Sequence, residues 1–453
     1  MRRTVNAPPD SLASTAPHPL ARTAALTPAQ ALGHSHSSQP FRTPRAPRAL
    51  KALLAEADVR LDGSRPWDLK VHDPRLYRRV LTHWSLGLGD AYVDGDWDCE
   101  QLDELFTRLL RHRLDGQPVG FSRWRMAWAL TSAALDNPQR ATRAFVVGRH
   151  HYDLGNDLFG RMLDPLRQYS CAWWAHASTL EQAQADKLEM ICRKLQLRPG
   201  MRLLDIGCGW GGLARWAAEH HGAHVTGITI SREQAAWAQQ HCLGLPVDIR
   251  LVDYRALHDE TPFDRIASVG MFEHVGPKNH RAYFDAARRL LRPDGLFLLH
   301  TIGLDRPGGG TDAWIEKRIF PGGRLPAASV LAASAEREFV IEDWHNFGPD
   351  YDRTLMAWHE SFEAAWPDLA PRYGERFHRL WRYYLLSCAG FFRSRQGQLW
   401  QLVLAPHERG QVYRSVRPDA QALAGCKSTI GADPQPPAAG CVNSSSSMPP
   451  PSS

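Results

Sequence analysis

From about residue 151 onward, short apolar runs typical of β-strands alternate with longer runs that have a helical period. Strands that alternate with helices in this way pair in parallel, and the helices between them cover both faces of the sheet. The sequence therefore predicts an α/β fold built on a parallel sheet. The expected strands are 202–206, 224–230, 247–252, 264–270, 295–301 and 398–404, and the expected helices are 212–221, 231–242, 279–291, 352–366 and 371–393.

A smaller and mostly helical domain is expected ahead of this region, at residues 46–135. Pro74 suits the first turn of one helix, and the segment Trp124–Leu135 is apolar on most sides. A further helix has an apolar stripe made of Leu102, Leu105, Phe106, Leu109 and Leu110. Three arginines lie off that stripe: Arg108, Arg111 and Arg113. They are either solvated or part of a basic surface that contacts anionic lipid head groups.

The charge distribution argues against a nucleic-acid-binding protein. The 453 residues carry a net charge of +6, and residues 1–50, with six Arg and one Asp, account for +5 of it. The part between the two termini is close to neutral, whereas nucleic-acid binding calls for a broad basic surface. We expect no nucleic-acid partner.

Both ends of the chain have the composition of disordered tails, with Pro, Ser and Ala enriched in 1–45 and again in 407–453. An organelle transit peptide is the alternative interpretation of the first tail. We expect 136–150 to be a linker and 151–406 to be the catalytic domain. No run approaches about 18 apolar residues, no apolar segment follows the initial Met-Arg-Arg, and the eight Cys form no CxxC pair. A cytoplasmic protein without a metal site is therefore expected.

A glycine-rich loop follows the first expected strand, in the stretch from Asp205 to Gly212. Its glycines also fit the G-x-G-x-x-G pattern of dinucleotide-binding folds, but the second strand ends without the acid that such folds need. An acid two residues before Gly207, with glycines again at Gly209 and Gly211, resembles the binding loop of class I methyltransferases. In that interpretation Asp205 reaches the methionine part of S-adenosylmethionine.

Four residues at or after the ends of the next two strands complete the expected cofactor site. Thr229 and Gln234 replace the missing acid, unless they are an ordinary strand residue and an ordinary helix-surface residue. Asp253 and Tyr254 follow the third strand, where they could contact the adenine.

Several longer motifs resemble the cyclopropane-fatty-acyl-phospholipid synthases, and the resemblance runs from about residue 47 to 404. The motifs are His151–Asp157, Tyr169–Trp174, Thr229–Gln234, Gly270–Gly276, His300–Gly303, Trp344–Gly348 and Tyr351–Trp358. The resemblance implies a Rossmann-like class I methyltransferase domain with added helices, preceded by a small lipid-docking domain. It also implies a homodimer at the inner face of the membrane that transfers a methylene group from S-adenosylmethionine to the cis double bond of an unsaturated phospholipid acyl chain.

The same resemblance implies roles for individual residues. A bicarbonate ion that acts as base would contact Cys171, Glu273, His300, the backbone N–H of Ile302, and Tyr351. The cofactor would contact Tyr169, Ser170, the loop at Gly207, Thr229 and Gln234. Cys388 matches a cysteine once proposed as a nucleophile in this family.

The implied chemistry sets three requirements. An alkene that attacks a sulfonium methyl group becomes a carbocation, so water must be excluded and an electron-rich group such as the Tyr351 ring should face the cation. A base must then remove a proton from the added methyl group. Glu273 could be that base directly or could hold the bicarbonate with His300, and the sequence leaves both mechanisms open.

No step of this chemistry requires a covalent enzyme intermediate, so Cys388 has no necessary role as a nucleophile. It lies on an aromatic helix that either packs as core or lines an acyl tunnel. Two other functions remain as alternatives: methyl transfer to carbon or nitrogen of another lipid or small molecule, and lipid binding without catalysis.

Overall fold

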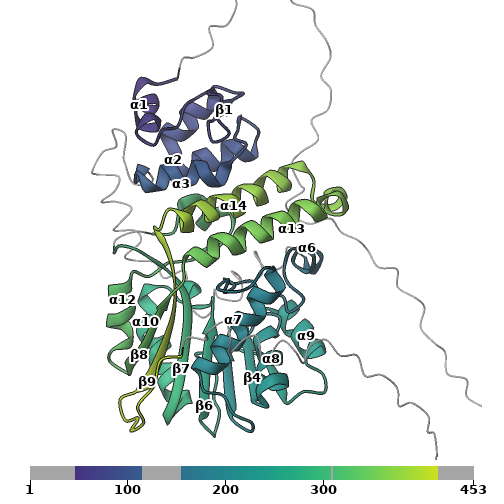
Figure 1. Cartoon of the computed structure of the whole chain (residues 1–453), viewed down its shortest axis with the longest axis vertical. Helices are drawn as coiled ribbons and strands as arrows, with labels where there is room; N and C mark the ends of the chain where they lie inside the picture. The colour runs from purple at the N-terminus through teal and green to yellow at the C-terminus, as the bar shows by residue number, and fades with distance from the viewer. Residues whose placement is uncertain (1–45, 115–154, 308–309, 417–453) are drawn as a thin grey trace, which may run out of the picture. The chain divides into compact units, whose positions relative to one another are not determined.

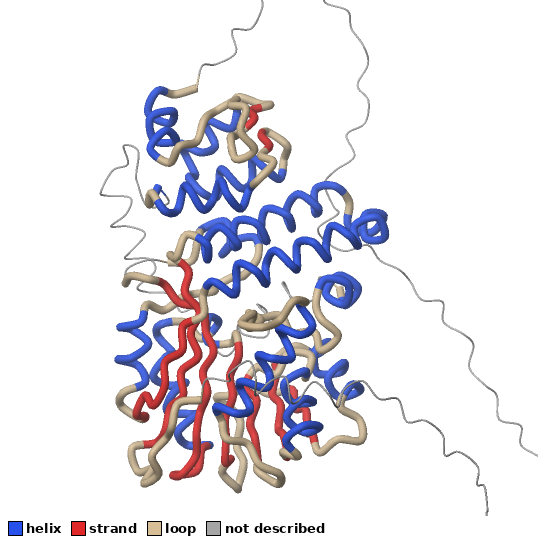
Figure 2. Tube along the Cα trace, in the orientation of Figure 1, coloured by secondary structure: helices blue, strands red, loops and turns tan. Residues whose placement is uncertain are grey.

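The structure is a computed structural model that describes residues 46–114, 155–307 and 310–416. It contains a seven-stranded sheet in the order β5-β4-β3-β6-β7-β9-β8, seen in the lower part of Figures 1 and 2. The strands are β3 (Arg202–Ile206), β4 (His224–Thr229), β5 (Val247–Leu251), β6 (Phe263–Val269), β7 (Leu291–Leu304), β8 (Phe339–Asn346) and β9 (Gly397–Pro406). The predicted strands are all present, and the α/β fold class is confirmed.

The prediction of a wholly parallel sheet is wrong at one edge. Strands β5, β4, β3, β6 and β7 are parallel, but β9 lies antiparallel between β7 and β8. The cause is the connection from β8 to β9. Helix α13 (Pro349–Tyr373) runs away from the sheet and α14 (Glu375–Arg393) returns, with Gly374 at φ 74° between them. The chain thus re-enters the sheet at the end where it left, and β9 must run in the opposite direction to β8.

Helices cover both faces of the sheet because both faces are apolar. On one face, α7 (Leu180–Lys194), α8 (Gly212–His221) and α9 (Arg232–His241) share a core with Leu203. On the other face, α10 (His280–Leu290) and α12 (Ala328–Ala335) share a core with Leu204. Adjacent residues of one strand therefore enter different cores, as the alternation of side chains along a strand requires.

Residues 46–114 form three helices and a short strand pair that pack on the helical hairpin. They comprise α1 (Arg48–Glu56), β1 (Lys70–Val71), α2 (Arg75–Val93), β2 (Trp97–Asp98) and α3 (Leu102–Arg111). Helices α2 and α3 contact α14, and α2 also contacts α11 (Ala313–Arg318). Arg393 of α14 binds Asp352 of α13 and Asp103 of α3, at 2.8 and 2.5 Å. The hairpin is thus held to the N-terminal helices by a partly buried ion-pair network as well as by apolar contact.

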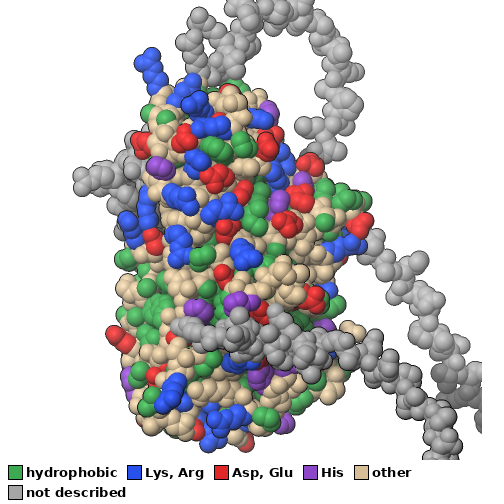
Figure 3. Space-filling model, in the orientation of Figure 1, with side chains coloured by type: hydrophobic (Ala, Val, Ile, Leu, Met, Phe, Trp, Pro, Cys, Tyr) green, Lys and Arg blue, Asp and Glu red, His purple; other side chains and the backbone are tan. Residues whose placement is uncertain are grey.

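Some of the arginines predicted to be solvated or to bind lipid have carboxylate partners. Arg108 contacts Asp58 and Glu104 at 2.9 and 2.8 Å, and Arg113 pairs with Asp305. Figure 3 shows Lys and Arg side chains interspersed with Asp and Glu over this part of the surface. The mixture favours a solvated surface over a strongly basic one.

The remaining short helices are α6 (Asn156–Met162), which contacts α13, and the 3-10 turns Phe272–His274 and Pro277–Asn279. Within the described ranges, no helix has the length and apolar character needed to cross a bilayer. The helix expected at 124–135, the linker at 136–150 and the tail at 1–45 lie outside the described residues, as does the part of the second tail after residue 416.

Candidate active site

The glycine-rich loop after β3 borders a cavity of about 200 Å³ at the carboxyl ends of the parallel strands. Gly207 and Gly209 have φ values of +84° and +54°, which residues with a side chain rarely adopt. A Cβ atom on Gly209 would meet no atom within 4 Å, so the backbone is open to the cavity there. Gly211 does not line the cavity. It precedes α8, and a Cβ atom there would lie 3.0 Å from Ala238 Cβ of α9. Gly211 therefore allows the loop to pack closely against α9.

Asp205 is a buried carboxylate at this cavity, with 2% of its surface exposed. Its Oδ2 atom has no hydrogen-bond partner among the described residues. Burial raises the pKa of Asp205 to about 7, and the nearby Lys187 opposes that rise. A buried carboxylate oxygen without a partner is costly, so it fits a cationic ligand group such as an ammonium.

Lys187 of α7 anchors the segment that carries Tyr169 and Ser170. Its Nζ donates to Gln168 Oε1 at 2.6 Å and to Ser170 Oγ at 3.0 Å. Burial lowers the pKa of Lys187 to about 8, and the charge of Asp164 opposes this change. The Tyr169 hydroxyl lies 2.8 Å from that of Tyr384 on α14. The predicted residues Tyr169 and Ser170 are therefore held at the cavity from two sides.

The other four predicted residues, on β4, on α9 and after β5, also line this cavity. The Thr229 hydroxyl donates to Gln234 Oε1 at 3.0 Å, and both side chains are buried. Asp253 binds Arg255 through both carboxylate oxygens. Tyr254 packs edge-on against Tyr283, and burial raises the pKa of Tyr254 to about 12.

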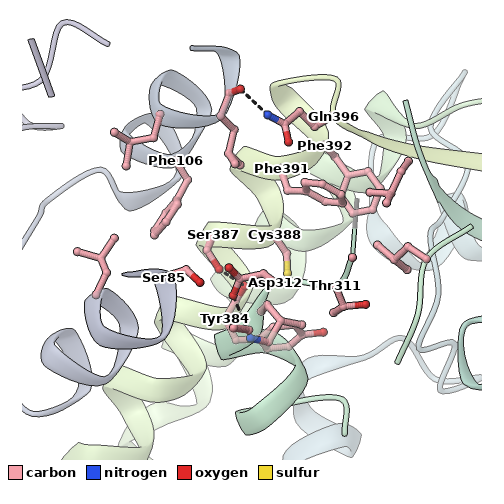
Figure 4. Close-up of a pocket in the computed structure, with 18 of the residues that line it drawn as sticks. Ser85, Phe106, Thr311, Asp312, Tyr384, Ser387, Cys388, Phe391, Phe392 and Gln396 are labelled. Carbon is pink, nitrogen blue, oxygen red and sulfur yellow. Dashed lines mark hydrogen bonds between the residues drawn. The ribbon is translucent and has the colours of Figure 1, made fainter. Parts of the chain in front are cut away.

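A second and larger cavity, of about 890 Å³, lies between the sheet, the α13–α14 hairpin and the N-terminal helices. Figure 4 shows Phe106 of α3 and Ser387, Cys388, Phe391 and Phe392 of α14 among the residues that line one part of it. The N-terminal helices contribute an almost wholly apolar wall, which includes Leu50, Leu53, Leu54, Leu76, Val80, Leu109 and Leu110. Such a cavity is suited to a long hydrocarbon chain.

Glu273 follows β6 and lines the larger cavity, although only 7% of its surface is exposed. Its Oε1 atom accepts the backbone N–H of Ile302 at 2.7 Å. Its Oε2 atom has no partner among the described residues. Burial raises the pKa of Glu273 to about 6, against the opposing hydrogen bond from Ile302. One oxygen of the carboxylate is therefore fixed by a hydrogen bond, and the other is available to a ligand. The Ile302 N–H, which was predicted to contact bicarbonate, donates to Glu273 Oε1 instead.

His300 of β7 lines the same cavity and has a similar arrangement. Its Nδ1 atom lies 3.2 Å from Gln401 Nε2, and its Nε2 atom has no partner within the described ranges. Burial and the charges of Lys187 and Lys194 hold the pKa of His300 well below its usual range. The ring is thus neutral near pH 7, with one nitrogen open.

Of the three remaining predicted residues, two line the larger cavity and one does not. Tyr351 lines the larger cavity and stacks on Phe392 with ring centres 4.5 Å apart. Cys388 lines it too, and burial raises the pKa of its thiol to about 12. Cys171 is fully buried but does not line the cavity, and its Sγ donates to the Ala172 carbonyl at 3.1 Å.

The two cavities meet at five residues that line both: Tyr169, Ser170, Gly270, His274 and Phe320. Gly270 has φ +67°, and the nearest atom to a Cβ there would be Ser170 Cβ at 3.8 Å. Burial lowers the pKa of His274 to about 4, so this ring adds no charge to the junction near pH 7. A group bound beside the glycine-rich loop can therefore approach a hydrocarbon chain in the larger cavity.

The family model described as mycolic acid cyclopropane synthetase matches residues 139–402, which is more than half of the chain. The chain belongs to this family. The cyclopropane-fatty-acyl-phospholipid synthase of Escherichia coli K12 is 54% identical over 359 residues, which cover 79% of this chain and 93% of that protein. A probable fatty acid methyltransferase of Pseudomonas putida is 34% identical and covers 80% of this chain and 95% of its own length. The predicted resemblance is confirmed, and the chain is an enzyme of the methyltransferase class.

Solved structures agree with the fold described above. The cyclopropane synthase MmaA2 of Mycobacterium tuberculosis superposes with a TM-score of 0.55 at 34% identity, over 58% of this chain and 98% of that one. Mycolic acid cyclopropane synthase CmaA1, complexed with SAH and CTAB, gives 0.54 at 33% identity, over 57% of this chain and 97% of that one. Coclaurine N-methyltransferase gives 0.58 at 20% identity, and that likeness concerns the fold alone. The class I methyltransferase fold is confirmed.

Sequence reasoning missed several residues that the structure places at the site. Gly270 and Phe320 stand at the junction of the cavities, and Lys187 supports the wall beside them. The signal for Lys187 was present, because it falls on the buried stripe of α7 together with Ala183 and Ile191. A lysine in an apolar stripe is costly to bury unless it has partners.

Proposed function

We propose that this enzyme transfers a methylene group from S-adenosylmethionine to the cis double bond of an unsaturated phospholipid acyl chain and so forms a cyclopropane ring. The observation that carries the proposal is the junction of a small cavity bordered by the glycine-rich loop with a large cavity whose N-terminal wall is apolar. Methyl transfer to a small polar molecule would need no hydrocarbon cavity of about 890 Å³.

The residues around the smaller cavity fit the cofactor. S-adenosylmethionine supplies an electrophilic methyl group on a sulfonium. The open Oδ2 of Asp205 is suited to its ammonium, and the exposed backbone at Gly209 is suited to close approach of the ligand. We assign Thr229, Gln234, Asp253 and Tyr254 to the nucleoside end, since all four line the same cavity at the ends of β4 and β5.

The walls of the larger cavity meet the first requirement of the chemistry, which is protection of a carbocation from water. Its mostly apolar lining, once an acyl chain fills the cavity, would keep water from the reacting carbon atoms. The ring of Tyr351, stacked on Phe392, places an electron-rich group in that wall. A ring face near a desolvated cation is worth about 2 kcal/mol.

Glu273 and His300 meet the second requirement, which is a proton acceptor. Each side chain lines the cavity and has one buried polar atom, Oε2 or Nε2, without a partner among the described residues. A bicarbonate ion held between them would supply the oxygen base, and a hydroxyl hydrogen of the ion would suit Glu273 Oε2. The alternative is direct proton transfer to Glu273 Oε2. Loss of this proton and closure of the third carbon–carbon bond complete the ring.

Neither of the two cysteines acts as a nucleophile in this proposal. The thiol of Cys388 stays protonated because burial raises its pKa to about 12, and a thiol is a weak nucleophile. We assign it to the wall of the acyl cavity. Cys171 is fully buried and does not line the cavity, so a direct contact with bicarbonate would require this side chain to turn.

We also propose that residues 46–135 receive the lipid, because their helices α1, α2 and α3 form the apolar wall of the larger cavity. Access to a bilayer lipid requires peripheral contact with the membrane, and we propose that this contact is at the inner face. We also propose that the enzyme is a homodimer. Vesicle binding that weakens with salt would support contact between arginines and head groups. Salt-independent binding would favour apolar insertion.

The proposed function is tested by expressing the chain in cells that contain unsaturated phospholipids and analysing their fatty acids by mass spectrometry. We expect acyl chains that are heavier by one CH2 and inert to alkene reagents. Chains that gain a methyl group but keep the double bond, or methylation confined to head groups, would overturn the proposal.

A further inference from the structure

His300 is held by a residue of the neighbouring strand that sequence reasoning did not single out. In the antiparallel register of β7 and β9, His300 stands directly opposite Gln401. The two side chains are almost completely buried, and Gln401 Nε2 lies 3.2 Å from His300 Nδ1. The amide of Gln401 is thus the direct partner of the inner ring nitrogen.

The orientation of that amide is determined by Lys194, the last residue of α7. Lys194 is fully buried, and its Nζ lies 2.8 Å from Gln401 Oε1. An ammonium group only donates hydrogen bonds, so the amide oxygen must face Lys194. The amide nitrogen then faces His300.

The tautomer of His300 follows from the same reasoning. The NH2 group of Gln401 also only donates, so His300 Nδ1 must accept and carries no hydrogen. A neutral imidazole with a bare Nδ1 has its hydrogen on Nε2. This is the nitrogen without a partner among the described residues, on a side chain that lines the larger cavity.

We propose that Lys194 and Gln401 are positioning residues that fix His300 as the Nε2–H tautomer, so that it presents a hydrogen-bond donor to an oxygen anion bound beside Glu273. The anion part of this inference rests on the proposed function. The opposite tautomer would direct a lone pair at the anion and repel it.

The buried charge of Lys194 has enough partners to remain in place. His345 Nδ1 lies 3.0 Å from its Nζ, and Asp343 Oδ2 lies 3.8 Å away. Both come from β8, whereas Gln401 is on β9. The ammonium therefore joins α7 to two strands of the sheet, which keeps it, and the amide that it orients, in one position.

The tautomer is measured directly by long-range ¹⁵N–¹H spectra of the full-length enzyme with labelled histidine, in which protonated and bare ring nitrogens resonate in different regions. The His300→Asn variant identifies the signals. We expect a hydrogen on Nε2 of His300 in the wild type and a mixture of tautomers in the Gln401→Met and Lys194→Met variants. A hydrogen on Nδ1 in the wild type would overturn the inference.

A kinetic test uses a matched control on the same strand. Gln398 is a buried glutamine three residues earlier on β9, so it lies on the other face, where it binds Asn346 and Arg395. We expect Gln401→Met to lower kcat about 10- to 100-fold and leave the KM for S-adenosylmethionine unchanged. Gln398→Met should lower thermal stability to a similar degree with little loss of kcat.

Bicarbonate dependence separates failure of this inference from failure of the proposed function. If Gln401→Met raises the bicarbonate concentration needed for half-maximal activity, the positioning role is supported. If the wild type responds to bicarbonate but Gln401→Met behaves as Gln398→Met does, the inference is wrong and the proposed function stands. If the wild type makes no cyclopropane lipid, the proposed function fails, whereas the tautomer spectrum still tests the role of Lys194 and Gln401.

Discussion

We propose that the chemistry of this enzyme depends on a few buried polar atoms that have no hydrogen-bond partner in the part of the chain that the structure describes. Asp205 Oδ2, Glu273 Oε2 and His300 Nε2 are three such atoms, and each belongs to a side chain that lines a cavity. Because an unpaired buried polar atom costs about 1–3 kcal/mol, these atoms are best explained by ligands that complete their hydrogen bonds.

The first prediction concerns Glu273. Glu273→Gln keeps the size of the side chain and an oxygen for the Ile302 N–H, but it removes the negative charge. We expect S-adenosylmethionine to bind with unchanged affinity by calorimetry, and kcat to fall about 10²- to 10⁴-fold. Full activity would remove Glu273 from the mechanism.

The second prediction concerns Cys388. Its thiol is protonated at neutral pH, and the proposed chemistry has no covalent enzyme intermediate. Cys388→Ala should therefore retain most of the activity in steady-state assays with unsaturated lipid vesicles. Loss of kcat as large as that of Glu273→Gln would show that the thiol takes part in the reaction.

Most of the residues at the site could be predicted from the sequence because the motifs around them resemble those of the family, and Glu273 also follows an apolar strand. His300 was expected near the end of its strand, but β7 continues to Leu304. Lys194 and Gln401 could not be predicted from the sequence. Their roles depend on which strands are neighbours, and the pairing of β7 with β9 is set by the α13–α14 hairpin rather than by any local pattern.

At the level of elements, the strand–helix alternation predicted the parallel part of the sheet because each unit buries its own apolar face. Strand β8 was missed because its middle carries Glu342 and Asp343, which weaken the apolar pattern. Helix α7 was missed as well, although it supplies two buried lysines to the site region.

The third prediction concerns the attachment of α7 to α8. Glu189 accepts hydrogen bonds from Arg193 at 2.6 Å and from His221 at 3.0 Å. Burial opposes ionisation, but these partners outweigh it and lower the pKa of Glu189 to about 2. Glu189→Gln should reduce the free energy of unfolding at pH 7 by about 1–3 kcal/mol, as measured in urea.

The pH dependence of this effect has a definite sign. A carboxyl group whose pKa is lowered in the folded state contributes stability above its unfolded pKa of 4.5 and loses it as the pH falls toward 2. The difference between wild type and Glu189→Gln should therefore narrow below about pH 4.5. A difference that stays constant down to pH 3 would show that the charge of Glu189 does not contribute.

At the scale of the whole molecule, the α13–α14 hairpin is the part that joins the N-terminal helices to the catalytic sheet. Its aromatic side chains line the larger cavity on one side, and Arg393 binds α3 on the other. The sequence predicted both helices and the apolar stripe of α3, but the cavity between these elements forms only when they are assembled.

The fourth prediction tests this cavity. Leu53 of α1 lines it, whereas Ala52, its neighbour, is exposed. Leu53→Trp should fill part of the space and lower the activity on long acyl chains by about tenfold, with S-adenosylmethionine affinity unchanged. Ala52→Trp is the control and should remain active. Equal activity of the two variants would show that the acyl chain does not use this part of the cavity.

The central claim is that a carbon–carbon double bond accepts the methyl group of S-adenosylmethionine. One hydrogen of that methyl group is then removed. The most direct measurement supplies purified enzyme with S-adenosylmethionine whose reactive methyl group carries three deuterium atoms, together with vesicles of an unsaturated phospholipid and bicarbonate. Mass spectrometry should find two deuterium atoms in a saturated ring within the acyl chain. Retention of all three deuterium atoms, on carbon, nitrogen or oxygen, would contradict the account.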